Sequence, residues 1–319
     1  MQIIDLHCDT LLKIWLSNGQ LSFCDAQELE SNKERLRKGG VKVQCFALFP
    51  PPNLTVEQKF QAVLSQIHYF YEEVLGKNRE MKQLKEWEDI DQLREGEIGA
   101  MLSLEGVDAI GDDLHKLTIL YQLGIRSIGL TWNQTNYAAG GASDAKGGGL
   151  TALGQKMVLF NNRHRMFTDV SHLNEQSYWD TLELAAYPIA SHSNARAILD
   201  HPRNLSDEQA KAMFANGGMV NLFFSPAFVK EGRRAAITDL LRHLDHFCSL
   251  GGVDYLGIGS DFDGISIPER INQLENAAML QNLVQELLRH YTEDQVRGFA
   301  SENFMRNRPK AKDKNEITA

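Results

Sequence analysis

The chain has 319 residues and a formal net charge of −9, and hydrophobic residues make up 43% and charged residues 24% of it. These proportions are ordinary for a globular protein that buries a sizeable core. The acidic balance argues against nucleic acid or an anionic membrane surface as a partner, because both attract basic proteins. Small molecules and other proteins remain as partners.

Targeting and redox signals are weak in this sequence. The first residues enter a strand-like run without a basic region before it, and no apolar span of about 18 residues occurs. The four cysteines are scattered without C-x-x-C spacing, which predicts neither a disulfide framework nor a zinc knuckle. We expect a soluble, cytoplasmic protein that does not bind membranes, with a homodimer as the base-rate expectation for its oligomeric state.

Short β-branched runs alternate with longer helical patterns along almost the whole chain, which is typical of a parallel sheet built from βα units. The expected strands are Ile3–Cys8, Val41–Phe49, Ile98–Leu104, Arg126–Trp132, Met166–Val170, Pro188–Ser191, Met219–Phe224 and Tyr255–Gly259. The expected helices are Val56–Tyr71, Glu88–Glu95, Asp112–Leu123, Ala152–His164, Asn174–Ala186, Ser206–Asn216, Ala235–Leu250 and Glu275–His290. This count predicts an α/β fold, a (β/α)8 TIM-type barrel of the metal-dependent hydrolase type.

The whole barrel is expected to be one catalytic domain over residues 1–307, with residues 308–319 as a frayed tail because they lack an apolar period. Two helix starts carry the spacing of a capping box, in Ser206–Gln209 and Thr292–Gln295. These signals place helix boundaries where the alternation of strands and helices requires them.

Ligand-type side chains follow five of the expected strands, at the end where barrel enzymes carry their chemistry. They are His7, Asp9, Glu105, His172, His192 and Asp261. The first two taken alone could equally be a packed histidine and a capping carboxylate. Because random placement would scatter six such residues over helices and both rims, their shared position predicts a metal site.

Three imidazoles and three carboxylates suit zinc or another first-row divalent ion. One ion rarely needs six protein ligands, so two ions about 3.5 Å apart that share a bridging carboxylate fit better. We predict that His7 and Asp9 bind one zinc ion, that His172 and His192 bind the other, and that Glu105 bridges them.

Asp261 is left for proton transfer. A hydroxide held between two cations is already deprotonated near neutral pH, so the reaction needs a base that takes its proton on attack and delivers it to the leaving amine. A weak fifth ligand is an alternative role, compatible with the first. Asp263 is expected to be structural, because it lies in the turn beyond the strand. Arg203 could hold a substrate carboxylate bidentately or form a surface salt bridge.

The chain resembles the membrane (renal) dipeptidase family of metallopeptidases, within the amidohydrolase group of barrels. The resemblance covers nearly the whole chain and rests on the order and spacing of Asp5-Leu-His-Cys-Asp9, Ser103-Leu-Glu-Gly106, Gly149-Leu-Thr-Ala-Leu-Gly154, Asp169-Val-Ser-His172, Ser191-His-Ser193, Arg203-Asn, Met219-Val-Asn221 and Gly259-Ser-Asp-Phe-Asp-Gly264. It implies a binuclear zinc site with the partition given above, Asp261 as the proton carrier and Arg203 as the clamp on a terminal carboxylate. The implied reaction is hydrolysis of dipeptides, with tolerance of a D-residue at the C-terminal position.

One position departs from the family pattern. The mammalian members have a histidine after the fourth strand, in Leu-Thr-His, which is thought to polarise the scissile carbonyl, whereas this chain has Trp132 and then Asn133. An indole N–H donates a hydrogen bond but cannot replace an imidazole. Trp132, Asn133 or the first metal must therefore stabilise the oxyanion, and the sequence leaves the choice open. The mammalian signal peptide, lipid-anchor signal and disulfides are not seen, so the resemblance is to soluble bacterial members.

Two rival functions remain at this stage. A lactonase or deaminase of the same barrel group would share the metal ligands, but its neutral substrate would not need a carboxylate clamp at Arg203. A metal-stabilised barrel that only binds would lose thermal stability on chelation and would turn over no dipeptide.

Overall fold

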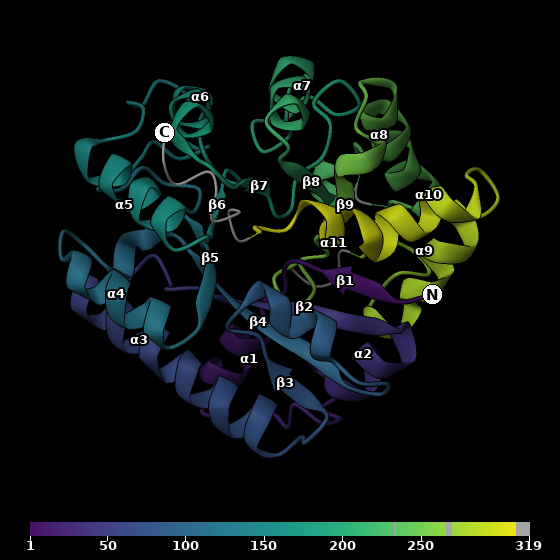
Figure 1. Ribbon diagram of the computed structural model, residues 1–319, viewed down its shortest axis with the longest axis horizontal. Coiled ribbons are helices and arrows are strands. Elements are labelled where there is room, and N and C mark those ends of the chain that lie inside the picture. Colours follow the sequence, from purple (N-terminus) through teal and green to yellow (C-terminus); the bar gives the residue numbers. More distant parts are fainter. Residues whose placement is uncertain (233, 266–269, 311–319) are drawn as a thin grey trace.

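The structure is a computed structural model that describes residues 1–232, 234–265 and 270–310. Eight parallel strands form a barrel at its centre: β1 (Ile3–Asp5), β2 (Val41–Leu48), β4 (Ile98–Glu105), β5 (Ile125–Gly129), β6 (Phe167–Asp169), β7 (Pro188–Ala190), β8 (Met219–Leu222) and β9 (Leu256–Ile258). The sheet runs in the order β2-β1-β9-β8-β7-β6-β5-β4, and pairing of β2 with β4 closes it. The predicted (β/α)8 fold is confirmed (Figure 1).

A ninth strand, β3 (Met81–Gln83), was not predicted. It pairs with Ile98–Ala100 of β4, on the side where β5 begins to pair only from Leu102 onward. The helix expected over Glu88–Glu95 is wrong as an α-helix, because the chain there forms a 3₁₀ helix, Trp87–Gln92. Its buried Trp87 packs edge-on against Phe167 at a ring distance of 5.0 Å, so tertiary packing decides this segment.

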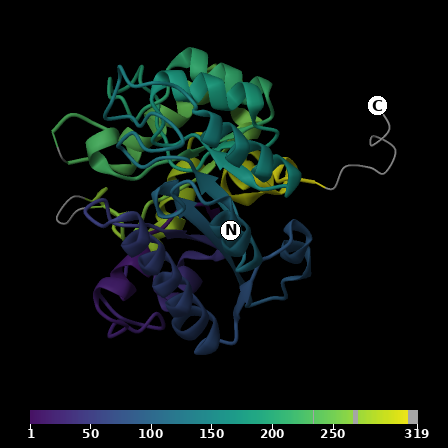
Figure 2. The same ribbon diagram turned by 90° about the vertical axis from the view of Figure 1, so that its left-hand side faces the viewer.

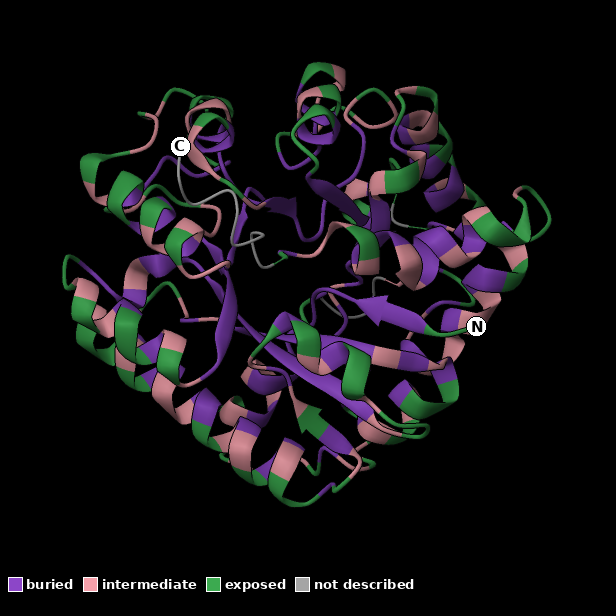
Figure 3. Ribbon diagram, viewed as in Figure 1, coloured by how far each residue is buried: buried purple, intermediate pink, exposed green. Residues whose placement is uncertain are grey.

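The helices cover the outside of the barrel, with their polar faces exposed and their inner faces buried (Figure 3). They are α1 (Thr10–Leu16), α2 (Lys33–Gly39), α3 (Val56–Tyr69), α4 (Leu114–Gln122), α5 (Ala152–Arg163), α6 (Glu175–Leu184), α7 (Asp207–Ala215), α8 (Ile237–Ser249), α9 (Leu280–Leu287), α10 (Glu293–Arg297) and α11 (Asn303–Asn307). Both predicted capping boxes, at Ser206 and Thr292, are confirmed. The short helices α1 and α2 were not predicted.

Two apolar cores hold the layers together. The larger core lies between the strands and the helices and includes Leu11, Phe46 and Phe247. The smaller core combines strand residues of the barrel with residues of the 3₁₀ helix and of α11, and comprises Ile4, Leu6, Val43, Cys45, Leu84, Trp87, Ile90, Met101, Phe167, Ile189, Met219 and Phe304. Side chains at every second position of a strand share a face. A residue two or four positions after an inner strand residue, such as Glu105 after Met101, therefore points inward at the mouth of the barrel.

The first third of the chain, purple and blue, lies on one side of the molecule, and the green middle part lies on the opposite side (Figure 2). Of the tail that was expected to fray, residues 311–319 lie outside the described residues. In the part of the chain that the structure describes, no helix combines the length and apolar character needed to cross a bilayer.

Candidate active site

The six predicted ligand-type residues follow five strands at their carboxyl ends. His7 and Asp9 lie beyond β1, Glu105 is the last residue of β4, and His172, His192 and Asp261 follow β6, β7 and β9. All are buried except Asp261, whose side chain is 13% exposed. The structure therefore brings together all six side chains that the sequence singled out.

The backbone between the β1 and β9 ends is held by pairing that continues past both strands. Asp9 N donates to Phe262 O at 2.9 Å, and Asp261 N donates to His7 O at 3.1 Å. Asp261 and His172 adopt left-handed backbone angles, with φ of 62° and 70°. Non-glycine residues avoid this region at a cost of order 1 kcal/mol, and such strain clusters at functional sites.

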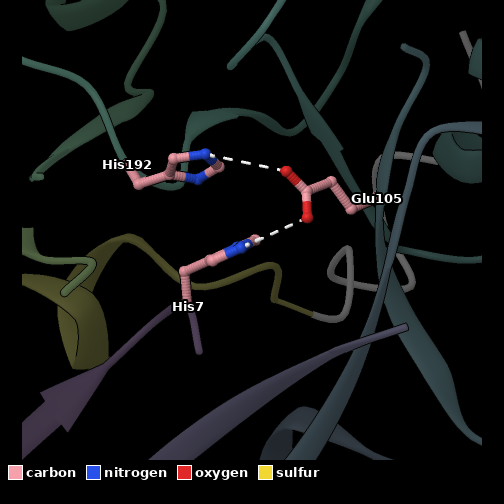
Figure 4. A group of neighbouring side chains, drawn as sticks. All are labelled: His7, Glu105 and His192. Carbon is pink, nitrogen blue, oxygen red and sulfur yellow. Dashed lines mark ion pairs between the residues drawn. The ribbon is translucent and has the colours of Figure 1, made fainter. Parts of the chain in front are cut away.

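His7 and His192 approach the Glu105 carboxylate from the same side, and each faces a different oxygen (Figure 4). Its Oε2 is 3.5 Å from His7 Nε2, whereas its Oε1 is 2.9 Å from His172 Nε2 and 3.9 Å from His192 Nε2. The two oxygens of one carboxylate thus face different histidines, which is the arrangement that a bridging ligand requires.

Two further carboxylates approach the same nitrogen of His7. His7 Nε2 lies 3.7 Å from Asp9 Oδ2 and 3.6 Å from Asp261 Oδ1. The geometry supports two cation-sized groups, one of His7, Asp9 and Asp261 and one of His7, Glu105 and His192. Asp261 therefore lies close enough to be a ligand as well as a proton carrier.

The site contains more acceptors than donors. His7 Nε2 and Asp9 Oδ1 are buried without a hydrogen-bond partner among the described residues. His172 Nδ1 lies 2.7 Å from the Asn133 side-chain oxygen, so Nδ1 carries the proton and Nε2 a lone pair. That lone pair faces Glu105 Oε1 and His192 Nε2, the latter at 2.8 Å. Such crowding fits a bound cation, and the nitrogen and oxygen donor set suits zinc.

Burial decides the protonation state of His172 and His192. It lowers the pKa of His172 to about 4 and the pKa of His192 well below its usual value, so both imidazoles are neutral at physiological pH. Neutral imidazole is the form that binds metals. Burial alone would also lower the pKa of His7, but the charges of Glu105 and Asp9 raise it well above its usual range.

The carboxylates respond in opposite directions. Burial, and then the charge of Asp9, raise the pKa of Asp261 well above its usual range. Burial opposes ionisation of Glu105 as well, but His7 and His172 outweigh it and lower the pKa of that carboxyl. Bound cations would favour ionisation of every carboxylate here, because opposite charges lower a carboxyl pKa.

Arg203 is buried beside the ligands, so the alternative of a surface salt bridge is wrong. Its Nη2 donates to His192 O at 3.3 Å, and its guanidinium lies 5.7 Å from the centre of the Phe223 ring. No carboxylate in the described part of the chain forms an ion pair with it. Burial lowers the pKa of Arg203 to about 10, which leaves it cationic at neutral pH.

Trp132 and Asn133 lie on the loop after β5. Trp132 is half-buried, packs edge-on to Phe49 at 5.3 Å and lies 6.2 Å from the His172 ring. The Asn133 oxygen is engaged by His172 Nδ1. This oxygen therefore orients the His172 imidazole, a contact that sequence reasoning missed.

Asp263 has the structural role that was predicted. Its carboxylate accepts hydrogen bonds from Thr10 Oγ1 at 2.7 Å and from the main-chain N–H of Glu30 at 2.8 Å, and Lys13 Nζ lies 2.9 Å away. These contacts anchor the turn after β9 to α1 and to the loop before α2.

Four buried residues next to the six ligand-type residues were also missed: Asp5, Ser260, Asp169 and Ser191. Their signal in the sequence is faint. Each aspartate ends a strand two or three residues before a ligand histidine, and each serine directly precedes a ligand-type residue.

The chain is similar to known dipeptidases over nearly its whole length. A sequence profile of the membrane dipeptidase family, peptidase family M19, matches residues 1–318. An uncharacterized dipeptidase of Schizosaccharomyces pombe is 30% identical over an alignment of 331 positions, which covers 96% of this chain and 79% of that protein.

Two solved structures are similar over nearly their whole length. Dipeptidase AC, a metallopeptidase of family M19, has a TM-score of 0.87 and 27% identity, with 97% of this chain and 98% of that chain covered. A metallopeptidase of Rhodobacter sphaeroides, liganded with a phosphinate mimic of the dipeptide L-Ala-D-Ala, has a TM-score of 0.87 and 26% identity, with 97% and 99% covered.

Proposed function

This chain belongs to the membrane dipeptidase family of metallopeptidases, and from that premise we propose that it is a dipeptidase with two zinc ions that accepts a D-residue at the C-terminal position of its substrate. The position of Arg203 is the observation that supports this proposal most strongly. This buried guanidinium has no ion pair among the described residues and lies against His192, within the ligand cluster.

A dipeptide carries its terminal carboxylate only one residue away from the scissile bond. A fixed guanidinium next to the reacting centre therefore selects dipeptides over longer peptides. Only a dipeptide can place its terminal carboxylate at the guanidinium and its scissile bond at the reacting centre at the same time. The planar fork of arginine suits a carboxylate, and its low exposure strengthens the charge pairing. In a lactonase or deaminase that acts on a neutral substrate, the substrate would not pair with Arg203. Burial of this charge would then cost folding free energy without serving the reaction.

His7, Asp9, Glu105, His172 and His192 are the residues that would hold the two ions, with Glu105 shared between them. When bound, such ions lower the pKa of a water molecule to near neutral and polarise the scissile carbonyl. His7 Nε2 and Asp9 Oδ1, which are buried and find no hydrogen-bond partner in the described part of the chain, support this assignment.

Asp261 is the proposed proton carrier. Its carboxylate lies 3.6 Å from His7 Nε2, and it is the most exposed of the three carboxylates around the site. From this position it would take a proton from the attacking water and give it to the leaving nitrogen, so that the amine departs neutral.

Tolerance of a D-residue is supported by the dipeptide mimic bound to the Rhodobacter sphaeroides relative. Trp132 is the proposed substrate-contacting side chain of the β5 loop, because it is half-buried next to His172. Asn133 would act mainly through the imidazole that it contacts.

The decisive test compares L-Ala-D-Ala, L-Ala-L-Ala and the C-terminal amide of L-Ala-D-Ala on metal-analysed protein. We expect two zinc ions per chain, turnover of both dipeptides and a preference for the free acid over the amide of at least about 100-fold, since a lost charged hydrogen-bond pair costs roughly 3 kcal/mol or more. The variant Arg203→Met should abolish that preference. Equal turnover of acid and amide by the unaltered protein would refute the proposal.

The matched control is Arg196→Met, in the same loop. The Arg196 guanidinium donates to the main-chain oxygens of Asn204 and Pro202, so its loss should leave the ratio of acid to amide turnover unchanged. A second variant, Asp261→Asn, should keep the zinc content and reduce kcat by several orders of magnitude.

A further inference from the structure

Two strand pairs beneath the ligands carry the same hydrogen-bonded unit. Across β1 and β9, Asp5 Oδ1 accepts from Ser260 N at 2.9 Å, and Asp5 Oδ2 accepts from Ser260 Oγ at 2.6 Å. Across β6 and β7, Asp169 Oδ1 accepts from Ser191 N at 2.9 Å, and Asp169 Oδ2 accepts from Ser191 Oγ. All four residues are buried, so the unit is shielded from water.

The second unit continues into a ligand imidazole, whereas the first does not. Ser191 Oγ lies 2.8 Å from His192 Nδ1. Ser260 Oγ instead lies 3.3 Å from the main-chain oxygen of His7. The Asp5–Ser260 unit therefore fixes a backbone turn, and the Asp169–Ser191 unit reaches the ring of His192.

The direction of the hydrogen bonds follows from the chemistry of the carboxylate. An ionised carboxylate only accepts, so the Ser191 hydroxyl must donate its single proton to Asp169. Its lone pairs are then the partners that remain for His192 Nδ1, which must carry the imidazole proton. Nε2 is left with a lone pair, and it faces Glu105 Oε1 at 3.9 Å and His172 Nε2 at 2.8 Å.

We propose that Asp169 and Ser191 are positioning residues that hold His192 in its Nδ1–H tautomer and so present Nε2 for metal binding. The metal part of this proposal rests on the proposed function, whereas the tautomer is a property of the protein alone. Partners beyond the direct ligands commonly change metal affinity by about 10- to 100-fold.

The variant Asp169→Asn keeps the size and shape of the side chain but reverses the donor direction of the hydrogen bonds from residue 169 through Ser191 to His192. Two main-chain N–H groups, of Ser191 and Ser171, point at Oδ1 and fix the amide with its oxygen there. The amide nitrogen then replaces Oδ2 and donates to Ser191 Oγ. Of the two acceptors left for the Ser191 hydroxyl, His192 Nδ1 at 2.8 Å is nearer than Ser171 Oγ at 3.4 Å. Donation to Nδ1 places the imidazole proton on Nε2, where it blocks a metal.

The test measures the tautomer and the metal affinity separately on the full chain. Nitrogen-15 NMR of the metal-stripped protein, with folding checked by circular dichroism, should show His192 as Nδ1–H in the unaltered protein and as Nε2–H in Asp169→Asn. Its resonance is assigned with a His192→Asn variant. Chelator competition should show zinc bound at least tenfold more weakly by Asp169→Asn and by Ser191→Ala, with affinity recovered in Ser191→Thr, which keeps the hydroxyl.

Two controls separate this role from a general loss of structure. Asp5→Asn makes the same change in the unit that does not reach an imidazole, so the His192 tautomer should stay Nδ1–H. Ser103→Ala removes a buried barrel hydroxyl that makes no hydrogen bond to a ligand side chain among the described residues, so zinc affinity should stay within about twofold.

An Nδ1–H tautomer in Asp169→Asn together with unchanged zinc affinity would overturn the proposal. If that variant does not fold, Ser191→Ala decides: retention of a pure Nδ1–H tautomer and of full zinc affinity would overturn it equally. A correct tautomer and zinc content in a protein that hydrolyses no dipeptide would refute the proposed function and leave this inference standing.

Discussion

Gly264 lies against the two carboxylates at the β1–β9 side of the site, and its replacement by alanine should disable the enzyme. A Cβ at this position would lie 2.2 Å from Asp9 Oδ2 and 2.4 Å from Asp261 Oδ1. Cβ contacts shorter than 3.0 Å essentially do not occur in proteins. Because both oxygens would be too close, the added methyl must displace both carboxylates, or the turn that carries Asp261, by roughly 1 Å.

The size of the effect follows from this displacement. A misplacement of about 1 Å at a reacting centre can cost on the order of 100-fold in rate. Overpacking of a buried site costs about 1–3 kcal/mol of stability, which a chain of this size should tolerate. We therefore expect Gly264→Ala to fold, to lose at least about 100-fold in kcat/KM for L-Ala-D-Ala, and to bind less zinc after dialysis.

The assay pairs turnover with metal analysis and thermal unfolding. Gly148→Ala is the matched control, because a methyl there meets no atom within 4 Å and the backbone does not need a left-handed conformation. It should keep kcat/KM within about twofold. Wild-type turnover and zinc content in folded Gly264→Ala would refute the claim that this glycine sets the spacing of the two carboxylates.

Three further predictions concern stability. Burial lowers the pKa of His243 to about 4 and outweighs the ring's two main-chain hydrogen bonds, with Ala195 N at 3.1 Å and Val229 O at 2.9 Å, which act to raise that pKa. As the pH falls from 6.5 to about 4, the unfolded chain binds a proton at His243 that the folded chain excludes. The unfolding free energy should therefore fall by up to about 3 kcal/mol. Urea titrations across this pH range should show a smaller fall in the unfolding free energy for His243→Gln. Asp263→Asn should lower Tm by several degrees and reduce turnover, because the turn after β9 loses an anchor; scanning calorimetry with an activity assay checks both. Chelation should lower Tm and zinc should restore it, since close acceptors otherwise repel one another; an unchanged Tm would argue against a resident metal.

The sequence predicted the barrel strands because each is a short buried run whose apolar residues stand out locally. The positions of the six ligand-type residues followed from those strands, since a parallel barrel gathers the carboxyl ends of all its strands at one mouth. Segments that depend on distant contacts were predicted less well. The 3₁₀ helix at Trp87–Gln92 and strand β3 exist because they pack on β4 and on the barrel interior.

The sequence by itself determined the fold class and the set of ligand-type residues, because both depend on periodicity and on position along single strands. Only the tertiary structure decided which side chains orient those ligands. The contact of Asn133 with His172 joins residues 39 positions apart, and the contact of Asp169 with Ser191, which continues to His192, joins residues 22 positions apart. Such hydrogen bonds depend on the register between neighbouring strands and on left-handed turns at non-glycine residues, and neither leaves a periodic pattern in the sequence.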